Sequence, residues 1–165
     1  MTIQTAGTVT ISRSDSNNNS LLASNKTGVV VGKIKAQALY EAINIEKLYV
    51  DFTAYQGGGT DELTGFYLYN HEGKQIAEAS VTSSNASALL FNMESAPYNI
   101  PVNTTKELTI KADTGNADMS GAATNAGPAQ GFYMTVKSAS MTAKGASGQT
   151  ATATSAILIY PNYLL

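Results

Sequence analysis

The chain has 165 residues, which is enough for one domain with a buried core. It carries 10 basic and 12 acidic residues and a net charge of −2, so no basic surface is predicted to neutralise the phosphates of a nucleic acid. The absence of cysteine excludes disulfides, thiolate metal sites and a cysteine nucleophile. No run of about 18 apolar residues is present, so no membrane-spanning helix is predicted.

Residues 2–12 are uncharged and rich in β-branched side chains, which predicts a strand at the N-terminus. Ile3, Thr5, Val9 and Ile11 would share one face of this strand. Two interpretations stay open. The strand pairs within its own sheet, or it acts as an arm and pairs with a neighbouring subunit by strand addition, with these four residues as the inter-subunit strand.

The chain divides into three parts by composition. Residues 1–13 form the N-terminal strand or arm, residues 14–28 a hinge rich in serine and asparagine, and residues 29–165 the body of the domain. Within the hinge, residues 21–23 are apolar and predict a short strand.

Residues 28–53 contain two long stretches that alternate with a period of two, which predicts two half-buried strands. In the second stretch the apolar phase changes between Ile45 and Leu48. We therefore expect a bulge or bend at Glu46 and Lys47.

Further short strands follow, separated by turns. Residues 70–74 predict a hairpin turn in which Gly73 takes positive φ, and residues 113–131 predict a long loop. Residues 150–160 predict one long final strand that Pro161 ends. Eight to ten such strands predict an all-β fold: a two-sheet antiparallel β-sandwich, jelly-roll-like, with an extended N-terminal strand.

Several patterned strands and turns carry a resemblance: residues 31–36, 45–50, 65–69 with Gly73, 98–102 and 105–113. In these stretches the chain resembles a β-sandwich module of secreted cell-surface proteins of bacteria and archaea. The resemblance implies an extracellular or cell-surface location and a structural role. An isolated sandwich with a spare N-terminal strand is also similar in architecture to subunits of extracellular filaments built by donor-strand complementation.

Few residues predict chemistry. His71 is the only histidine and lies in the predicted hairpin turn, so no Ser-His-Asp arrangement can be built elsewhere. The glycines at 57–59 lack the lysine and hydroxyl residue of a phosphate loop. Asp61 and Glu62 lie in a loop without apolar neighbours to raise a carboxyl pKa. The sequence therefore predicts a protein that is not an enzyme.

Asp113, Asn116 and Asp118 lie on a loop that contains glycine, and their oxygen atoms suit Ca²⁺. The same residue types are also the commonest in solvated turns, and their spacing does not match an EF-hand. Asp15, or Asp61 with Glu62, could complete a site if the fold brings them close. No other cofactor is predicted.

Two surface features point to sugars. The sequons at Asn18, Asn25, Asn85 and Asn103 lie in predicted loops, where glycans attach to secreted chains. Tyr49, Tyr67 and Tyr69 lie on predicted outward faces of strands. Such tyrosines bind sugars, pair strands across a sheet or fill a subunit contact.

The sequence therefore favours a structural subunit of an extracellular filament or tube that polymerises with itself by strand addition of residues 2–12. Two alternatives stay open. One is a carbohydrate-binding or adhesin module with glycans as partners, and the other is a viral jelly-roll coat or decoration protein.

Overall fold

The computed structural model describes residues 6–15, 20–23, 25–55, 63–79, 89–115, 131–136, 141–155 and 158–164. These residues form strands and turns and no helix, so none of them provides a helix that could cross a membrane. The strands are β1 (Thr8–Arg13), β2 (Ser20–Leu22), β3 (Val29–Leu39), β4 (Ile43–Tyr55), β5 (Leu63–Tyr69), β6 (Gln75–Ala79), β7 (Leu89–Asn92), β8 (Tyr98–Ile100), β9 (Thr105–Thr114), β10 (Gly131–Val136), β11 (Thr142–Gly145), β12 (Thr152–Ser155) and β13 (Leu158–Leu164).

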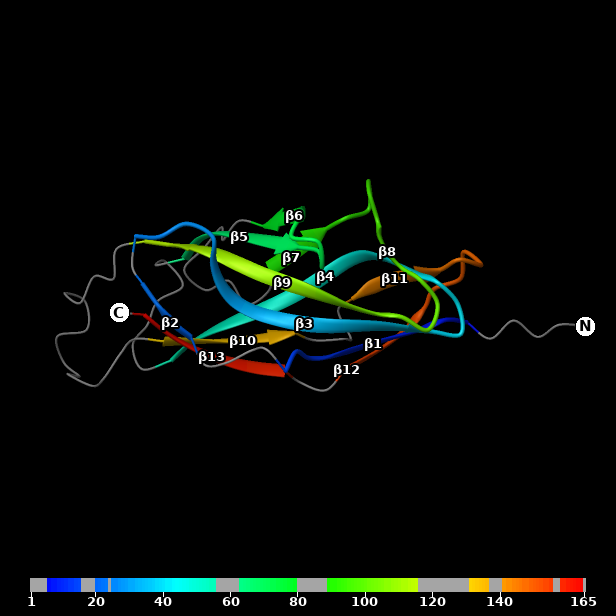
Figure 1. Cartoon of the computed structure of the whole chain (residues 1–165), viewed down its shortest axis with the longest axis horizontal. Helices are drawn as coiled ribbons and strands as arrows, with labels where there is room; N and C mark the ends of the chain where they lie inside the picture. Colours follow the sequence, from blue (N-terminus) through cyan, green and yellow to red (C-terminus); the bar gives the residue numbers. More distant parts are fainter. Residues whose placement is uncertain are drawn as a thin grey trace, which may run out of the picture.

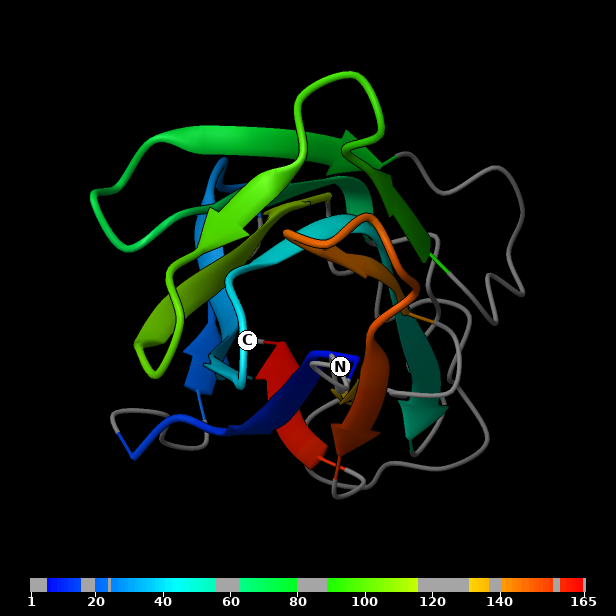
Figure 2. The same ribbon diagram turned by 90° about the vertical axis from the view of Figure 1, so that its right-hand side faces the viewer.

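The strands form two sheets that enclose one core (Figures 1 and 2). The six-stranded sheet has the order β12-β1-β3-β9-β5-β6. The seven-stranded sheet has the order β11-β4-β10-β13-β2, and β7 and β8 also pair with β4. Most pairs are antiparallel, while β1–β12 and β2–β13 are parallel. The predicted all-β sandwich is confirmed.

Alternation along the strands builds the core. In β9, Leu108, Ile110 and Ala112 are fully buried while the residues between them face outward. Among the side chains that the structure describes, Phe66 and Phe91 are the largest that are fully buried, one from each sheet. Burial of such apolar faces between two sheets is the main source of stability in a sandwich.

The predicted bulge in the central strand is confirmed. Ile45 and Leu48 are both fully buried, although they are three residues apart. In the pairing with β11, Thr142 lies opposite Lys47 and Ala143 opposite Ile45, so Glu46 is the extra residue. The bulge lets β4 keep its apolar side chains in the core on both sides of the change in phase.

The prediction of one long strand over residues 150–160 is wrong. β12 belongs to the six-stranded sheet and β13 to the seven-stranded sheet, so the chain changes sheets between them. Pro161 lies inside β13, opposite Tyr133 of β10. The described pairing with β2 begins only at Asn162, so at Pro161 the strand has a described neighbour on one side alone. A strand position with one neighbour can accommodate proline, which has no N–H to donate.

Replacing Phe66 by alanine would test the core. We expect Phe66→Ala to lower the free energy of unfolding by about 3–5 kcal/mol, because the ring leaves a cavity between the sheets. Val102→Ala is the control and should change it by less than about 0.5 kcal/mol, since Val102 is 44% exposed. Urea unfolding measures both. Equal losses for the two variants would contradict this assignment of the core.

Candidate functional site

The N-terminal strand β1 is an interior strand of the six-stranded sheet. It pairs antiparallel with β3 and parallel with β12, and Figure 1 shows it beside β12. Val9 and Ile11 point into the core and are 0% and 1% exposed. Val9 lies in register between Ala38 and Ala153, whose small side chains leave room for its branched one. We call the position between β3 and β12 the β1 seat.

A carboxylate fixes the start of β1. Glu41, in the turn between β3 and β4, accepts a hydrogen bond on Oε1 from the Gly7 N–H at 2.8 Å. Its Oε2 accepts the Ser147 N–H at 2.8 Å, and the Ser147 hydroxyl donates to Oε1 at 3.1 Å. We call Gly7, Glu41 and Ser147 the Glu41 clasp. The β3–β4 turn and the β11–β12 turn that carry it lie at the same end of the molecule (Figure 1).

The clasp depends on glycine and on charge. A Cβ atom at Gly145 would lie 1.9 Å from Oε1 of Glu41, and one at Gly7 would lie 2.6 Å from Cγ of Glu41. Side chains at either position would therefore displace the carboxylate. The Ser147 N–H, supported by the Gly7 N–H, holds the pKa of Glu41 below its ordinary value of 4.5.

A second contact fixes the other end of β1. Ser14 is 1% exposed, its N–H donates to the Lys33 carbonyl at 3.2 Å, and its hydroxyl donates to Glu107. Next to it, Asp15 forms an ion pair with Lys35, which lowers the pKa of Asp15. β1 is thus held at both ends within its own chain.

Of the four residues predicted as an inter-subunit strand, Val9 and Ile11 lie in the core of their own chain. Ile3 and Thr5 lie outside the described residues. The structure therefore gives β1 a seat within its own sheet. Exchange of this strand with a neighbouring subunit stays a prediction.

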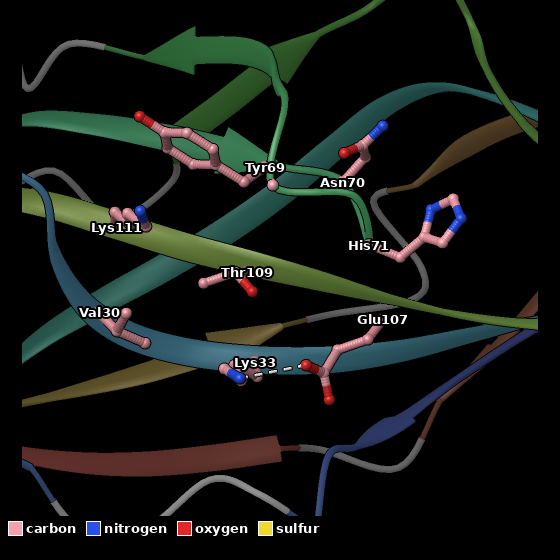
Figure 3. A pocket seen from close by; sticks show the side chains of 9 residues that line it. Val30, Lys33, Tyr69, Asn70, His71, Glu107, Thr109 and Lys111 are labelled. Carbon is pink, nitrogen blue, oxygen red and sulfur yellow. Dashed lines mark hydrogen bonds and ion pairs between the residues drawn. The ribbon is translucent and has the colours of Figure 1, made fainter.

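A hollow of about 300 Å³ opens on the outer face of the six-stranded sheet, the face opposite the core (Figure 3). Ligand pockets start at about this size. Thr109 of β9 forms its floor, in register with Lys33 of β3 on one side and Tyr69 of β5 on the other. The lining residues are Val30, Lys33, Tyr69, Asn70, His71, Gly73, Glu107, Thr109 and Lys111.

The two lysines of the hollow have different partners. Lys33 forms an ion pair with Glu107 at 3.2 Å. The Lys111 ammonium lies 4.2 Å from the centre of the Tyr69 ring, a cation–π contact between diagonal neighbours on β9 and β5. Among the described residues, no carboxylate lies within ion-pair distance of Lys111.

His71 forms one wall of the hollow and has fixed partners. Lys106 lies 2.9 Å from Nε2, and the Tyr98 hydroxyl lies 3.0 Å from Nδ1. Because an ammonium only donates, Nε2 accepts in this contact, and Nε2 also lies 3.9 Å from a carboxylate oxygen of Glu72. Burial raises the pKa of Tyr98. Among the described residues, no serine or threonine hydroxyl bonds to either ring nitrogen, and these two contacts position the ring.

Asp113 has a structural role in the described part of the chain. Its Oδ1 accepts the Gly28 N–H at 2.8 Å, and its Oδ2 accepts the Tyr67 hydroxyl at 2.6 Å. The second bond raises the pKa of Tyr67. The other two predicted calcium ligands, Asn116 and Asp118, lie outside the described residues, as do Asp61 and Glu62. Calcium binding stays a prediction, and the described residues contain no group of three or more acidic or histidine side chains placed for a metal.

The three predicted outward tyrosines do not form one row. Tyr67 and Tyr69 share the outer face of β5, while Tyr49 lies on β4 in the other sheet, opposite Leu90. Two of the four sequon asparagines, Asn25 and Asn103, lie in exposed loops with φ of 53° and 57°. The other two, at positions 18 and 85, lie outside the described residues, and glycosylation stays a prediction.

No protein-family model and no curated protein matches the chain. Solved structures match it at low identity. A chain of the CaDoc0917–CaCohA2 complex matches with a TM-score of 0.42 and 11% identity, over 96% of this chain and 100% of that one. AvmM, which catalyses macrocyclization in alchivemycin A biosynthesis, matches with a TM-score of 0.41 and 5% identity over 96% and 87%. ACE19, the collagen-binding subdomain of the Enterococcus faecalis surface protein ACE, matches with a TM-score of 0.33 and 10% identity over 83% and 92%. At these values the likenesses carry no argument about function.

Glu41 and Lys111 were not predicted as site residues. Glu41 is the only charged residue between Lys35 and Glu46 and lies at the end of an alternating stretch. Such an isolated charge is the feature of the sequence that could have identified it as a site residue. Its partners Gly7 and Ser147 are 34 and 106 residues away and could not be inferred from spacing. The pairing of Lys111 with Tyr69 likewise depends on which strands are neighbours.

Replacing Glu41 by glutamine would test the clasp. The amide keeps the size but has one acceptor oxygen, so Glu41→Gln should lower the melting temperature at pH 7 by roughly 2–4 °C. Because folding lowers the pKa of Glu41, the wild-type advantage is complete above pH 4.5 and is lost as the pH falls through the lowered pKa. Circular dichroism melts between pH 7 and pH 3 should show that the difference in melting temperature between the wild type and Glu41→Gln decreases as the pH falls.

Glu78→Gln on the exposed face of β6 is the matched control, and its melting temperature should stay close to that of the wild type. A gap between Glu41→Gln and the wild type that widens in acid would contradict the role of the Glu41 carboxylate.

Proposed function

We propose that the chain is a non-catalytic β-sandwich module of a cell surface that binds a carbohydrate through the outer-face hollow. The observation that carries this proposal is the Tyr69–Lys111 pair beside the hydroxyl of Thr109, in a hollow of about 300 Å³. An aromatic ring with hydrogen-bonding groups around it matches the mixed apolar and polar surface of a sugar ring.

The position of the hollow supports binding. Its lining side chains alternate along β5 and β9 with Leu68, Leu108 and Ile110, all fully buried in the core. The core therefore fixes the backbone beneath the hollow, and side chains on such a rigid sheet need little ordering when a ligand binds. The low charge content of the chain and its wealth of serine and threonine suit an extracellular surface.

A glycan array with the purified protein would test this function. We expect selective binding of a subset of glycans, and Tyr69→Ala should weaken it about fivefold to tenfold because the stacking surface is lost. Tyr40→Ala is the matched control, since Tyr40 is 71% exposed in the β3–β4 turn and does not line the hollow. An array without selective binding, or an equal loss in both variants, would refute the proposal.

A second candidate function is a homopolymer built by exchange of β1, and the β1 seat favours it. Val9 and Ile11 contact strands that are distant in sequence, so the same strand from a second copy could make the same contacts. In this function each copy donates residues 2–12 to the seat of the next copy. The head-to-tail contact does not close on itself and would propagate into a filament or tube.

A pair of introduced cysteines would show whether the strand in the β1 seat comes from the same chain or from a second copy. Thr10 and Thr154 are register partners whose hydroxyl oxygens lie 3.1 Å apart, and the native chain has no cysteine. In Thr10→Cys with Thr154→Cys, exchange predicts a ladder of disulfide-linked species on a non-reducing gel of the assembled protein. Each single variant should give no ladder. Assemblies in the electron microscope that yield only internally linked monomers would contradict exchange.

A further inference from the structure

We infer that the ligand of the hollow is an acidic sugar, a hexuronate unit of an anionic polysaccharide, and that Lys111 binds its carboxylate. This inference rests on the proposed function and names its ligand class. The inference rests on the position of Lys111, which has no described carboxylate partner and lies over the Tyr69 ring at the edge of the hollow.

The charge of the hollow favours a single anion. Its described charged residues are Lys33, Lys111 and Glu107, and Lys33 is matched by Glu107 at 3.2 Å. Nε2 of His71 lies 2.9 Å from the Lys106 ammonium and 3.9 Å from a carboxylate oxygen of Glu72. Lys111 is therefore the described lining lysine that has no carboxylate partner, although the whole chain carries −2. A ligand with one carboxylate for each sugar unit matches this charge, while a densely sulfated chain would need several free cations.

The position of Lys111 suits an incoming carboxylate. The Tyr69 ring holds its ammonium at 4.2 Å, and this contact leaves the three N–H donors of the ammonium without a carboxylate acceptor among the described residues. A bound carboxylate would gain charge-assisted hydrogen bonds without breaking an existing ion pair. Figure 3 shows the Thr109 side chain between Lys111 and Lys33, where its hydroxyl could reach a sugar hydroxyl.

The side-chain oxygen of Asn70, which also lines the hollow, already has hydrogen-bond partners within the protein. The side-chain oxygen of Asn70 accepts the N–H groups of Glu72 and Lys74 within the 70–74 turn. Val30 is 37% exposed and offers an apolar surface across the hollow from Tyr69 (Figure 3). The hollow thus has a cation and a hydroxyl between two apolar surfaces, a pattern that matches a pyranose ring with one carboxylate.

Matched polysaccharides test the ligand class. Oligogalacturonate and its methyl ester share the same sugar backbone, and the ester replaces the charge of each carboxylate by a methyl group. Calorimetry with the wild-type protein should give an affinity about tenfold higher for the free acid. Lys111→Gln should remove this difference. Lys26→Gln is the control for charge, since Lys26 is exposed and does not line the hollow, and it should retain the difference.

The possible results separate the claim of an acidic ligand from the claim of sugar binding. Equal affinity for the acid and its ester, or an equal effect of Lys26→Gln and Lys111→Gln, would overturn the acidic ligand and leave the sugar-binding function standing. Binding of polyglutamate but of neither oligomer would overturn it in favour of an acidic protein partner. Failure to bind any acidic or neutral glycan would refute the proposed function itself.

Discussion

The six-stranded sheet depends on the insertion of β1 between β3 and β12. Neither pair is a hairpin between consecutive strands, and the β1–β12 pair joins the first and twelfth strands in parallel. Without β1, the backbone groups of β3 and β12 that face it would lose their partners, and the core would lose Val9 and Ile11. The Glu41 clasp is a consequence of this insertion, because it needs Gly7, directly before β1, close to Ser147 in the β11–β12 turn.

The β1 seat and the outer-face hollow share residues. Ser14, at the end of β1, donates its hydroxyl to Glu107, and Glu107 pairs with Lys33 in the hollow. Both Lys33 and Glu107 also line the hollow. If β1 left its seat, Ser14 would no longer orient this carboxylate, although the charges at the hollow would stay the same. Under the proposed function, a ligand whose binding depends on the position of Glu107 would thus be linked to the position of β1, and by thermodynamic reciprocity each would shift the other.

Local features were predictable from the sequence, while the neighbours of each strand were not. A period of two depends only on adjacent residues, so the buried faces of β5 and β9, the buried face of β3 from Gly32 to Ala38 and the bulge at Glu46 followed from the sequence. The register shift between Val30 and Gly32, which exposes Val30 and buries Val31, did not. The same alternation continued through residues 150–160 although the chain changes sheets there, because each sheet offers the same kind of buried face. The Glu41 clasp and the Tyr69–Lys111 pair depend on register between distant strands, which no local pattern encodes.

The β1 seat does not distinguish between a strand of its own chain and an identical strand of a second copy. Every contact of Val9, Gly7 and Thr10 could form in either case, so the choice depends on effective concentration and on the linker at 14–28. The covalent connection favours the internal strand in dilute solution, because pairing within one chain does not depend on the protein concentration. The Glu41 clasp would slow the release of a strand of either origin. Exchange would therefore occur where subunits are concentrated before β1 has docked, and a docked module would stay a monomer.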